Sequence, residues 1–385
     1  MEALTLSLIL LFVVIAVAPL ISRRIGLPVI IVEMLIGIIL GDSMLKLIPR
    51  HPILSFFLEF GLTYLMFLAG LEIDLSGLKR NAYGVIFIAA LSLLIPFLTG
   101  FYIAPYVGIH PLLLGTILST TSLGLVIPLT KEEGYDGEIM QILLGSVIIV
   151  DVVSIFLLAL SLTFIQGSLG YSFFYSSIAV ILLFILPLLT RREYIQEKLN
   201  YLFYEKSYFE IEVRLSFALI FILAAISEIV GFHSIMGAFI AGVIISEITP
   251  KPSRLIEKLE GFGYGFFTPF FFILVGARAD IPMLLSNLGD LKMLLLIVGF
   301  GLISKVLGAG LASFTLEIST RRRIAIGLFH SARLSLILAA AQICREMGVL
   351  SGEQFSVFII LAMISALVAP SLGRRLLQPV SDEQI

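Results

Sequence analysis

The chain has 385 residues, of which 59% are hydrophobic and only 14% are charged. Soluble domains carry about 25% charged residues, so this composition excludes an ordinary soluble protein and predicts an integral membrane protein. The net charge of −2 without a basic tract argues against a nucleic-acid partner, and the single cysteine, Cys344, excludes an intrachain disulfide framework.

Thirteen apolar runs follow one another along the chain. A bilayer core about 30 Å thick requires about 20 apolar residues per helix, so we predict an all-α polytopic membrane protein with about 13 transmembrane helices. Glu2 stands where a signal peptide would carry basic residues, and we therefore keep the first run as a membrane helix. The predicted helices span residues 3–21, 27–45, 52–73, 82–104, 110–130, 139–165, 172–190, 211–230, 232–247, 262–277, 288–315, 324–344 and 354–373.

The basic residues of the connecting loops indicate the orientation. Lys and Arg accumulate on the cytoplasmic side of short loops. In the thirteen-helix arrangement one side holds eighteen basic residues, and the opposite side holds five, which are Lys46, Arg50, Arg278, Lys292 and Arg345. We expect a multi-pass protein of the plasma membrane with its N-terminus outside and its C-terminus in the cytoplasm.

The two halves of the chain resemble each other. The segment "IGLPVIIVEMLIGIILGD" (25–42) aligns without gaps with "VGFHSIMGAFIAGVIISE" (230–247), and "FLAGLEIDL" (67–75) matches "ILVGARADI" (273–281). An odd number of helices separates equivalent elements, so the halves enter the membrane from opposite sides. We predict a first inverted repeat in 1–165, a linker helix and loop in 166–210, and a second inverted repeat in 211–385, an architecture typical of secondary transporters.

Helices 5 and 12 are predicted to be discontinuous and to cross. Helix 5 contains four successive hydroxyl residues, Ser119 to Ser122, followed by Gly124 and Pro128, and helix 12 contains Arg333 among polar residues. Interruptions of this kind release backbone groups that can bind ions.

Three of the charged side chains inside predicted helices converge on one level of the membrane. Asp151 is the only charge in the run from Ile139 to Ile165, and Lys305 and Arg333 lie within helices 11 and 12. At about 1.5 Å per residue, Thr121, Arg333 and Asp151 lie about 14–18 Å from a helix end, near the bilayer midplane. A carboxylate at this depth costs about 2.5–3.5 kcal/mol, so we expect it to have a function.

One carboxylate can bind either H⁺ or a cation. Desolvation favours its protonated form, and a bound cation favours its ionised form. We predict that Asp151, Thr120, Thr121 and Ser122 bind the ion or the proton, and that Asp151, Thr121 and Ser122 hold the metal cation. Lys305 and Arg333 are expected as supporting charges, together with Glu72 near the cytoplasmic end of helix 3. No cofactor other than the transported Na⁺ or K⁺ and H⁺ is expected.

The sequence resembles the monovalent cation:proton antiporter-2 family, which includes NapA-type sodium/proton antiporters and the membrane domain of Kef-type systems. The resemblance covers the whole chain and is carried by the segments quoted above, by "LSTTSLGLVIPLTKEEG" (118–134), "GSVIIVDVVSIFLL" (145–158) and "FTPFFFILVGARADI" (267–281). It implies an ion-carrying aspartate at Asp151, hydroxyl ligands at Thr121 and Ser122, and a supporting lysine at Lys305. It also implies a core of helices 4–6 and 11–13 that moves against a panel of helices 1–3 and 8–10, through which a homodimer forms.

Two departures bear on stoichiometry. NapA-like antiporters have an acid immediately before the ion-binding aspartate, whereas this chain has Val150, and it has Arg333 where sodium antiporters carry an acid in helix 12. With one titrating carboxylate we expect electroneutral exchange of Na⁺ for H⁺ by alternating access.

Other functions fit parts of the pattern. A Kef-type K⁺/H⁺ antiporter and a sodium-coupled symporter of organic solutes share the architecture, and a channel would need a continuous pore. A hydrolase built from Ser331 and His330 lacks a nucleophile motif, so we expect no enzyme. The individual residues also allow structural roles: Asp151 can pair with Lys305 or Arg333, and helical hydroxyls can bond to their own backbone.

Overall fold

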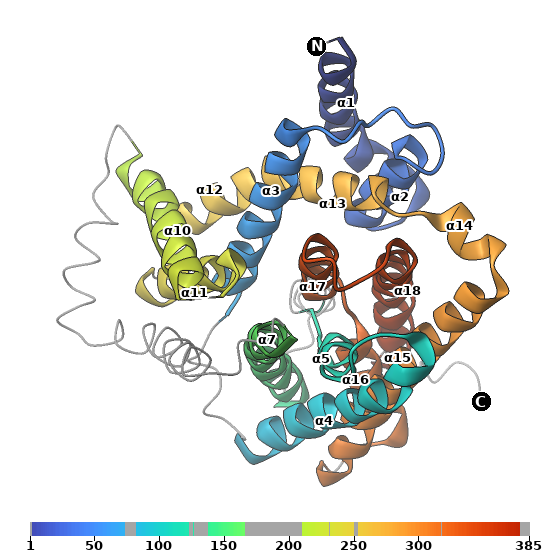
Figure 1. Ribbon diagram of the computed structural model, residues 1–385. Helices are drawn as coiled ribbons and strands as arrows, with labels where there is room; N and C mark the ends of the chain where they lie inside the picture. Colours follow the sequence, from blue (N-terminus) through green and yellow to red (C-terminus); the bar gives the residue numbers. More distant parts are fainter. Residues whose placement is uncertain are drawn as a thin grey trace. The chain divides into compact units, whose positions relative to one another are not determined.

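The computed structural model describes residues 2–73, 82–122, 126, 138–165, 210–230, 232–249, 253–316 and 318–377. Every regular element in these residues is a helix, as Figure 1 shows. Eight helical segments of the described chain are long and apolar enough to cross a membrane, and two shorter apolar helices accompany them. The prediction of an all-helical multi-pass protein is therefore confirmed, while the predicted helix 172–190 lies outside the described residues.

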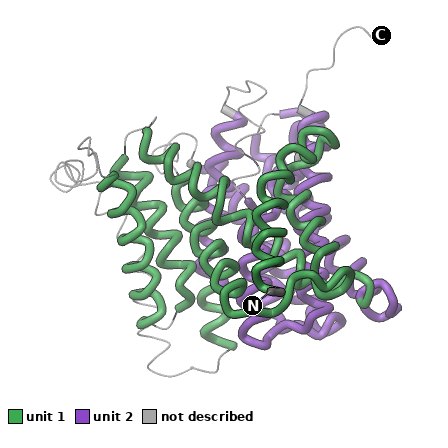
Figure 2. Tube along the Cα trace, turned by 90° about the horizontal axis from the view of Figure 1, so that it is seen from above, with its two compact units in different colours: residues 1–75, 159–283 green, residues 76–158, 284–385 purple. Residues whose placement is uncertain are grey.

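The chain forms two compact units, coloured separately in Figure 2. Unit 1 comprises Met1–Leu75 and Ala159–Met283, and unit 2 comprises Ser76–Leu158 and Leu284–Ile385. Unit 1 corresponds to the expected panel and unit 2 to the expected core, because each unit takes helices from both halves of the chain. The residues predicted to bind the ion all belong to unit 2.

Unit 1 is built from seven described helices and one π-helical turn. Their bounds are α1 Glu2–Ile25, α2 Val29–Leu40, α3 Pro52–Leu71, α10 Ile211–Ile229, α11 Ser234–Ile248, α12 Arg254–Phe262, the π turn Gly263–Phe267 and α13 Thr268–Ala277. Helix α12, the π turn and α13 follow one another directly and form one continuous helical segment. The predicted start of this segment at residue 262 was wrong, because the charged but amphipathic turn from Arg254, which buries Leu255 and Leu259, precedes the apolar run.

Glycines set the packing of unit 1. A Cβ on Gly70 of α3 would lie 2.1 Å from the Phe239 carbonyl oxygen of α11, and one on Gly242 of α11 would lie 2.1 Å from the Phe67 carbonyl oxygen of α3. Only glycine permits this backbone approach. Gly37 of α2 and Gly41, which directly follows that helix, pack in the same way against α13, so their small-residue spacing is used inside the chain.

Unit 2 contains the two interrupted helices. Its helices are α4 Ala82–Val107, α5 Pro111–Ser119, α15 Leu288–Ala312, α16 Thr320–Ser331, α17 Ser335–Glu346, α18 Gly352–Leu377 and most of α7 Glu138–Ile165; the short α14 Ile281–Ser286 precedes α15. Helix α15 packs between α4 and α16, and α18 packs on α16 and α17. The two predicted interruptions are confirmed at the end of α5 and between α16 and α17.

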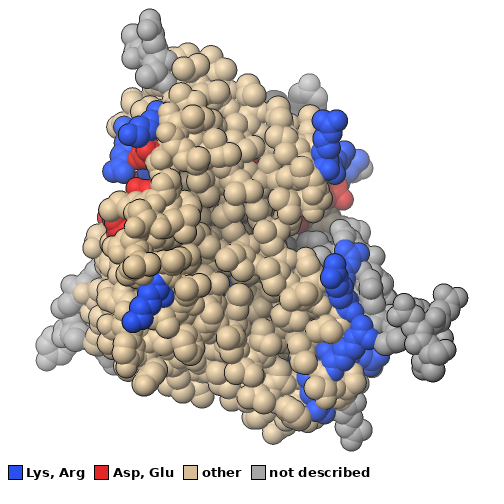
Figure 3. All heavy atoms as spheres, turned by 90° about the vertical axis from the view of Figure 1, so that its right-hand side faces the viewer, with Lys and Arg blue, Asp and Glu red and all other residues tan. Residues whose placement is uncertain are grey.

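Charged side chains avoid the middle of the face drawn in Figure 3. Described Lys, Arg, Asp and Glu residues lie towards its left and right margins, with a wide uncharged area between them. Charges lie where helices end, with Arg23 and Arg24 in the last turn of α1 and Arg374 and Arg375 in the last turn of α18. This distribution is that of helices crossing an apolar layer.

Candidate functional site

The first element of the site is the end of helix α5. The helix stops at Ser119, and Thr120 takes an extended conformation with ψ 157°. The hydroxyl groups of Ser119 and Thr120 donate to the carbonyls of Thr116 and Ile117, each at 2.8 Å. Thr120, Thr121 and Ser122 are all buried, so a helix terminus lies within the protein interior.

The second element is the break between α16 and α17, which lies against the first. Arg333 is in the break, and its Nε donates to the Thr120 carbonyl at 3.1 Å while its NH2 group donates to the Gly301 carbonyl of α15 at 2.8 Å. The Ser122 hydroxyl lies 3.4 Å from that of Ser335, the first residue of α17. The two interrupted helices therefore meet at their breaks.

Lys305 of α15 joins the same point from another side. Its side chain is fully buried, and its ammonium group donates to the Ser119 carbonyl at 2.5 Å and to the Ser92 carbonyl of α4 at 2.9 Å. Lys305 and Arg333 thus satisfy the last carbonyls of α5, where the helix dipole is negative. In this structure both cations stabilise the terminus of a broken helix.

Asp151 lies in the middle of α7 and is 8% exposed. Its carboxylate is near enough to the ammonium group of Lys305 for the two charges to interact, although the hydrogen bonds of Lys305 go to main-chain carbonyls. With Arg333, the described part of the site holds two cations and one carboxylate. A cation that binds Asp151 would therefore compete with these positive groups for the negative charge of the carboxylate. Cation binding then depends on whether the carboxylate is ionised or protonated.

Among the described residues of unit 2, two buried hydroxyl groups stand out because they make no hydrogen bond there. They belong to Thr121 and to Ser154, which follows Asp151 by three residues on α7. Buried hydroxyls normally find a partner. The sequence singles out Thr121 but not Ser154, since a lone serine in an apolar helix is common.

A buried histidine connects three helices beside the site. His330 of α16 is fully buried, its Nδ1 lies 2.9 Å from the Ser92 hydroxyl of α4, and its Nε2 lies 2.9 Å from the Ser146 hydroxyl of α7. The Ser146 hydroxyl donates to the Leu143 carbonyl, so it accepts from Nε2 and fixes the proton there. This is the neutral, hydrogen-bonded histidine that the sequence also allows.

Glu72 belongs to unit 1 and caps the end of α3. The Tyr264 hydroxyl donates to its Oε1 at 3.0 Å. Glu72 thus contacts the π turn of its own unit, whereas the other predicted site residues belong to unit 2.

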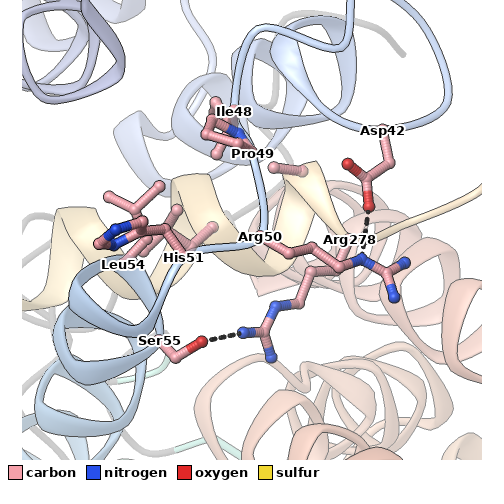
Figure 4. A pocket seen from close by; sticks show the side chains of 10 residues that line it. Asp42, Ile48, Pro49, Arg50, His51, Leu54, Ser55 and Arg278 are labelled. Atoms are coloured by element: carbon pink, nitrogen blue, oxygen red, sulfur yellow. Dashed lines mark hydrogen bonds and ion pairs between the residues drawn. The ribbon is translucent and has the colours of Figure 1, made fainter. Parts of the chain in front are cut away.

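A separate cavity of about 30 Å³ lies in unit 1, as Figure 4 shows. Arg50 Nε donates to Asp42 Oδ2 at 2.9 Å, and Arg278 NH2 donates to the Ser55 hydroxyl at 3.2 Å. These contacts tie together the ends of α2, α3 and α13. The cavity contains none of the residues predicted to bind the ion.

A buried carboxylate, two interrupted helices that meet at their breaks, and two compensating cations define a polytopic membrane protein of the secondary-transporter class. Residues 9–378 match the family model described as "Sodium/hydrogen exchanger, transmembrane". The chain belongs to this family.

Individual relatives support the assignment. The chain is 31% identical over 396 residues to the putative Na⁺/H⁺ antiporter YjbQ of Bacillus subtilis, with 96% of this chain covered but only 62% of that relative. It is 30% identical to the probable Na⁺/H⁺ antiporter 3 of Methanocaldococcus jannaschii, over 93% of this chain and 92% of that one. The solved structure of the sodium proton antiporter MjNhaP1 from the same organism matches with a TM-score of 0.66 at 17% identity, covering 97% and 98% of the two chains, which establishes a shared fold.

Proposed function

We propose that this protein is a secondary antiporter that exchanges a monovalent cation, Na⁺ in the first place, for H⁺ by alternating access. The observation that carries the proposal is the buried carboxylate of Asp151 in the unit where two broken helices meet, with Lys305 as its charged neighbour. The relatives named as Na⁺/H⁺ antiporters support the choice of ions. The family consists of transporters, and we infer no enzymatic reaction.

The exchange follows from competition for one group. Protonation or cation binding neutralises Asp151, and either loaded form is easier to move across a low-dielectric barrier than the empty carboxylate. Thr121 and Ser122 are proposed as further oxygen ligands of the cation. The Thr120 hydroxyl already donates to the Ile117 carbonyl. Thr120 therefore contributes to the site through its main-chain carbonyl, which accepts a hydrogen bond from Arg333.

The architecture of the transport cycle is part of the proposal. Helix bounds in the two halves correspond at the offset of 205 or 206 residues, for example Ala82–Val107 with Leu288–Ala312, and this supports the inverted repeats 1–165 and 211–385. We propose that unit 2 moves against unit 1, and that a homodimer forms through the predicted helices 1–3 and 8–10, which are α1–α3 and α10–α13 of the structure. We also propose that the protein lies in the plasma membrane with its N-terminus outside.

Two related functions remain as alternatives with distinct signatures. A Kef-type antiporter would move protons on addition of K⁺ and would respond less to Na⁺. A sodium-coupled symporter would take up Na⁺ only when an organic solute is present, whereas an antiporter moves protons when salt alone is added.

Substituting Asp151→Asn tests the proposal directly. In proteoliposomes with a pH-sensitive dye, the wild type should release protons on addition of Na⁺, and the variant should fall to the level of protein-free liposomes, because an amide neither titrates nor supplies a negative ligand. Asp290→Asn, which removes an acid from the first turn of α15, should leave the rate unchanged. Near wild-type proton movement by a folded Asp151→Asn protein would refute the assignment.

A further inference from the structure

Serine and threonine hydroxyls within helices of unit 2 follow a common rule. Each usually donates to the carbonyl three or four residues earlier, as membrane serines and threonines often do. Ser146 donates to Leu143 at 2.9 Å, Ser331 to Leu328 at 2.8 Å, and Ser356 to Gly352 at 2.8 Å. These hydroxyls have their hydrogen bonds within their own helix and need no ligand.

Ser154 breaks this rule. Its side chain is fully buried in α7, and its hydroxyl makes no hydrogen bond with the described part of the chain. An unpaired buried polar group costs about 1–3 kcal/mol. A back-bond of the kind made by Ser146 on the same helix would remove that cost, so the free hydroxyl is available to a partner that the described part of the chain does not supply.

The position of Ser154 identifies the partner. It follows Asp151 by three residues, and residues at this spacing lie on one helix face with Cβ atoms about 5–6 Å apart. Ser146 lies about 140° away from Asp151 around the helix, on the face that meets His330. Ser154 lies between them around the helix, about 60° from Asp151 and about 80° from Ser146, and along the helix axis it is much nearer to Asp151.

Thr121 supplies the same chemistry from the broken helix α5, since its hydroxyl is also buried and unpaired. Hard cations are bound by several oxygen ligands, which replace the water that they lose. We propose that Ser154 is a ligand of the transported cation, and that its hydroxyl acts with the Asp151 carboxylate and the Thr121 hydroxyl. This inference rests on the proposed function and adds a cation-selecting residue to it.

The test compares Ser154→Ala with Thr163→Val in purified protein. Thr163 lies on the same helix, and its hydroxyl donates to the Ala159 carbonyl at 2.9 Å, so it is a back-bonded control. Ser154→Ala should raise the Na⁺ concentration for half-maximal exchange about tenfold and change the ranking of Li⁺, Na⁺ and K⁺. Ser154→Thr, which retains the oxygen, should recover most of the affinity, and Thr163→Val should leave both properties unchanged.

Thermal stability separates a ligand from a structural residue. Because its hydroxyl is unpaired, Ser154→Ala should unfold without Na⁺ at the wild-type temperature or above, while the stabilisation by added Na⁺ should shrink. An unchanged half-maximal concentration and unchanged Na⁺ stabilisation would overturn the role of Ser154 while leaving the antiporter intact. Absence of exchange in the wild type would instead refute the proposed function itself.

Discussion

At the scale of single residues, Lys305 and Arg333 explain how a membrane helix can end in the protein interior. The carbonyls of Ser119 and Thr120 have no helical partner, and in an apolar environment each would be costly to leave unpaired. The ammonium and guanidinium groups satisfy them and also complement the negative end of the α5 dipole. The two cations are therefore structural as well as electrostatic neighbours of Asp151.

Removing the amine of Lys305 should destabilise the protein. Lys305→Met retains the chain length but leaves the Ser92 and Ser119 carbonyls without their donor. At about 1–3 kcal/mol for each unpaired group and about 2–4 °C per kcal/mol, we expect Tm to fall by about 5 °C or more in detergent. Lys305→Arg, which keeps a donor and the charge, should lose less.

The control for this prediction is Lys292→Met, an exposed lysine on the same helix. Its Tm should match that of the wild type. Equal Tm values for Lys305→Met and Lys292→Met would contradict a capping role of Lys305, and the lysine would then act on Asp151 alone.

The residues of the site differ in how far the sequence reveals them. Asp151, Lys305 and Arg333 are recognisable because charges are rare in apolar runs. Ser154 and Ser92 are not, because serine is common in such helices and only the packed structure decides whether its hydroxyl bonds to its own helix, to a histidine, or to nothing.

At the scale of helices, the close approach of α3 and α11 depends on glycine on both sides. A Cβ added at Gly242 would clash with the Phe67 carbonyl at 2.1 Å, and backbone cannot give way without separating the helices. We expect Gly242→Ala to destabilise unit 1 by about 1–3 kcal/mol, as overpacking does. Chemical denaturation followed by helical circular dichroism measures the change.

Gly299→Ala provides the matched substitution in α15. No atom lies within 4 Å of the position of its added Cβ, so alanine should be neutral or stabilise by about 0.5–1 kcal/mol through its higher helix propensity. If both alanine variants behaved alike, the helix contact would not be limiting for stability.

Hydropathy predicts the approximate positions of these helices more accurately than it predicts their first and last residues. The segment 27–45 shortens to Val29–Leu40 because Pro28 precedes the first turn and Gly41 is extended. The amphipathic start of α12 is missed because its charged residues lower the mean hydropathy. The breaks in α5 and between α16 and α17 are anticipated from polar clusters, whereas the partners that hold them come from distant helices.

At the scale of the whole molecule, each compact unit combines helices from both halves of the chain. Composition and hydropathy do not contain this grouping, because they describe neighbours in sequence and the contacts join residues that lie far apart along the chain, as Gly70 and Phe239 do at a separation of 169 positions. Only the resemblance to a known family implies it. The consequence is that unit 2 gathers the charges of the site from both halves of the chain, while close glycine contacts join the two halves within unit 1.

The charge inventory of unit 2 predicts the stoichiometry of exchange. Val150 stands where a second acid would add a second titrating carboxylate, so Asp151, as the proposed carrier, would hold either one H⁺ or one cation, and both loaded states would have the same net charge. In liposomes with a potassium–valinomycin potential, Na⁺-driven proton movement should be independent of voltage, and a sodium gradient should be balanced by an equal pH gradient. Arg333 remains protonated throughout, so among the described charged groups of the cluster Lys305 is the one other that can release a proton when a cation binds Asp151. A balance point that shifts with membrane potential would reject one-for-one exchange and identify Lys305 as the second proton carrier. In that case, exchange by the Lys305→Arg variant should again be independent of voltage.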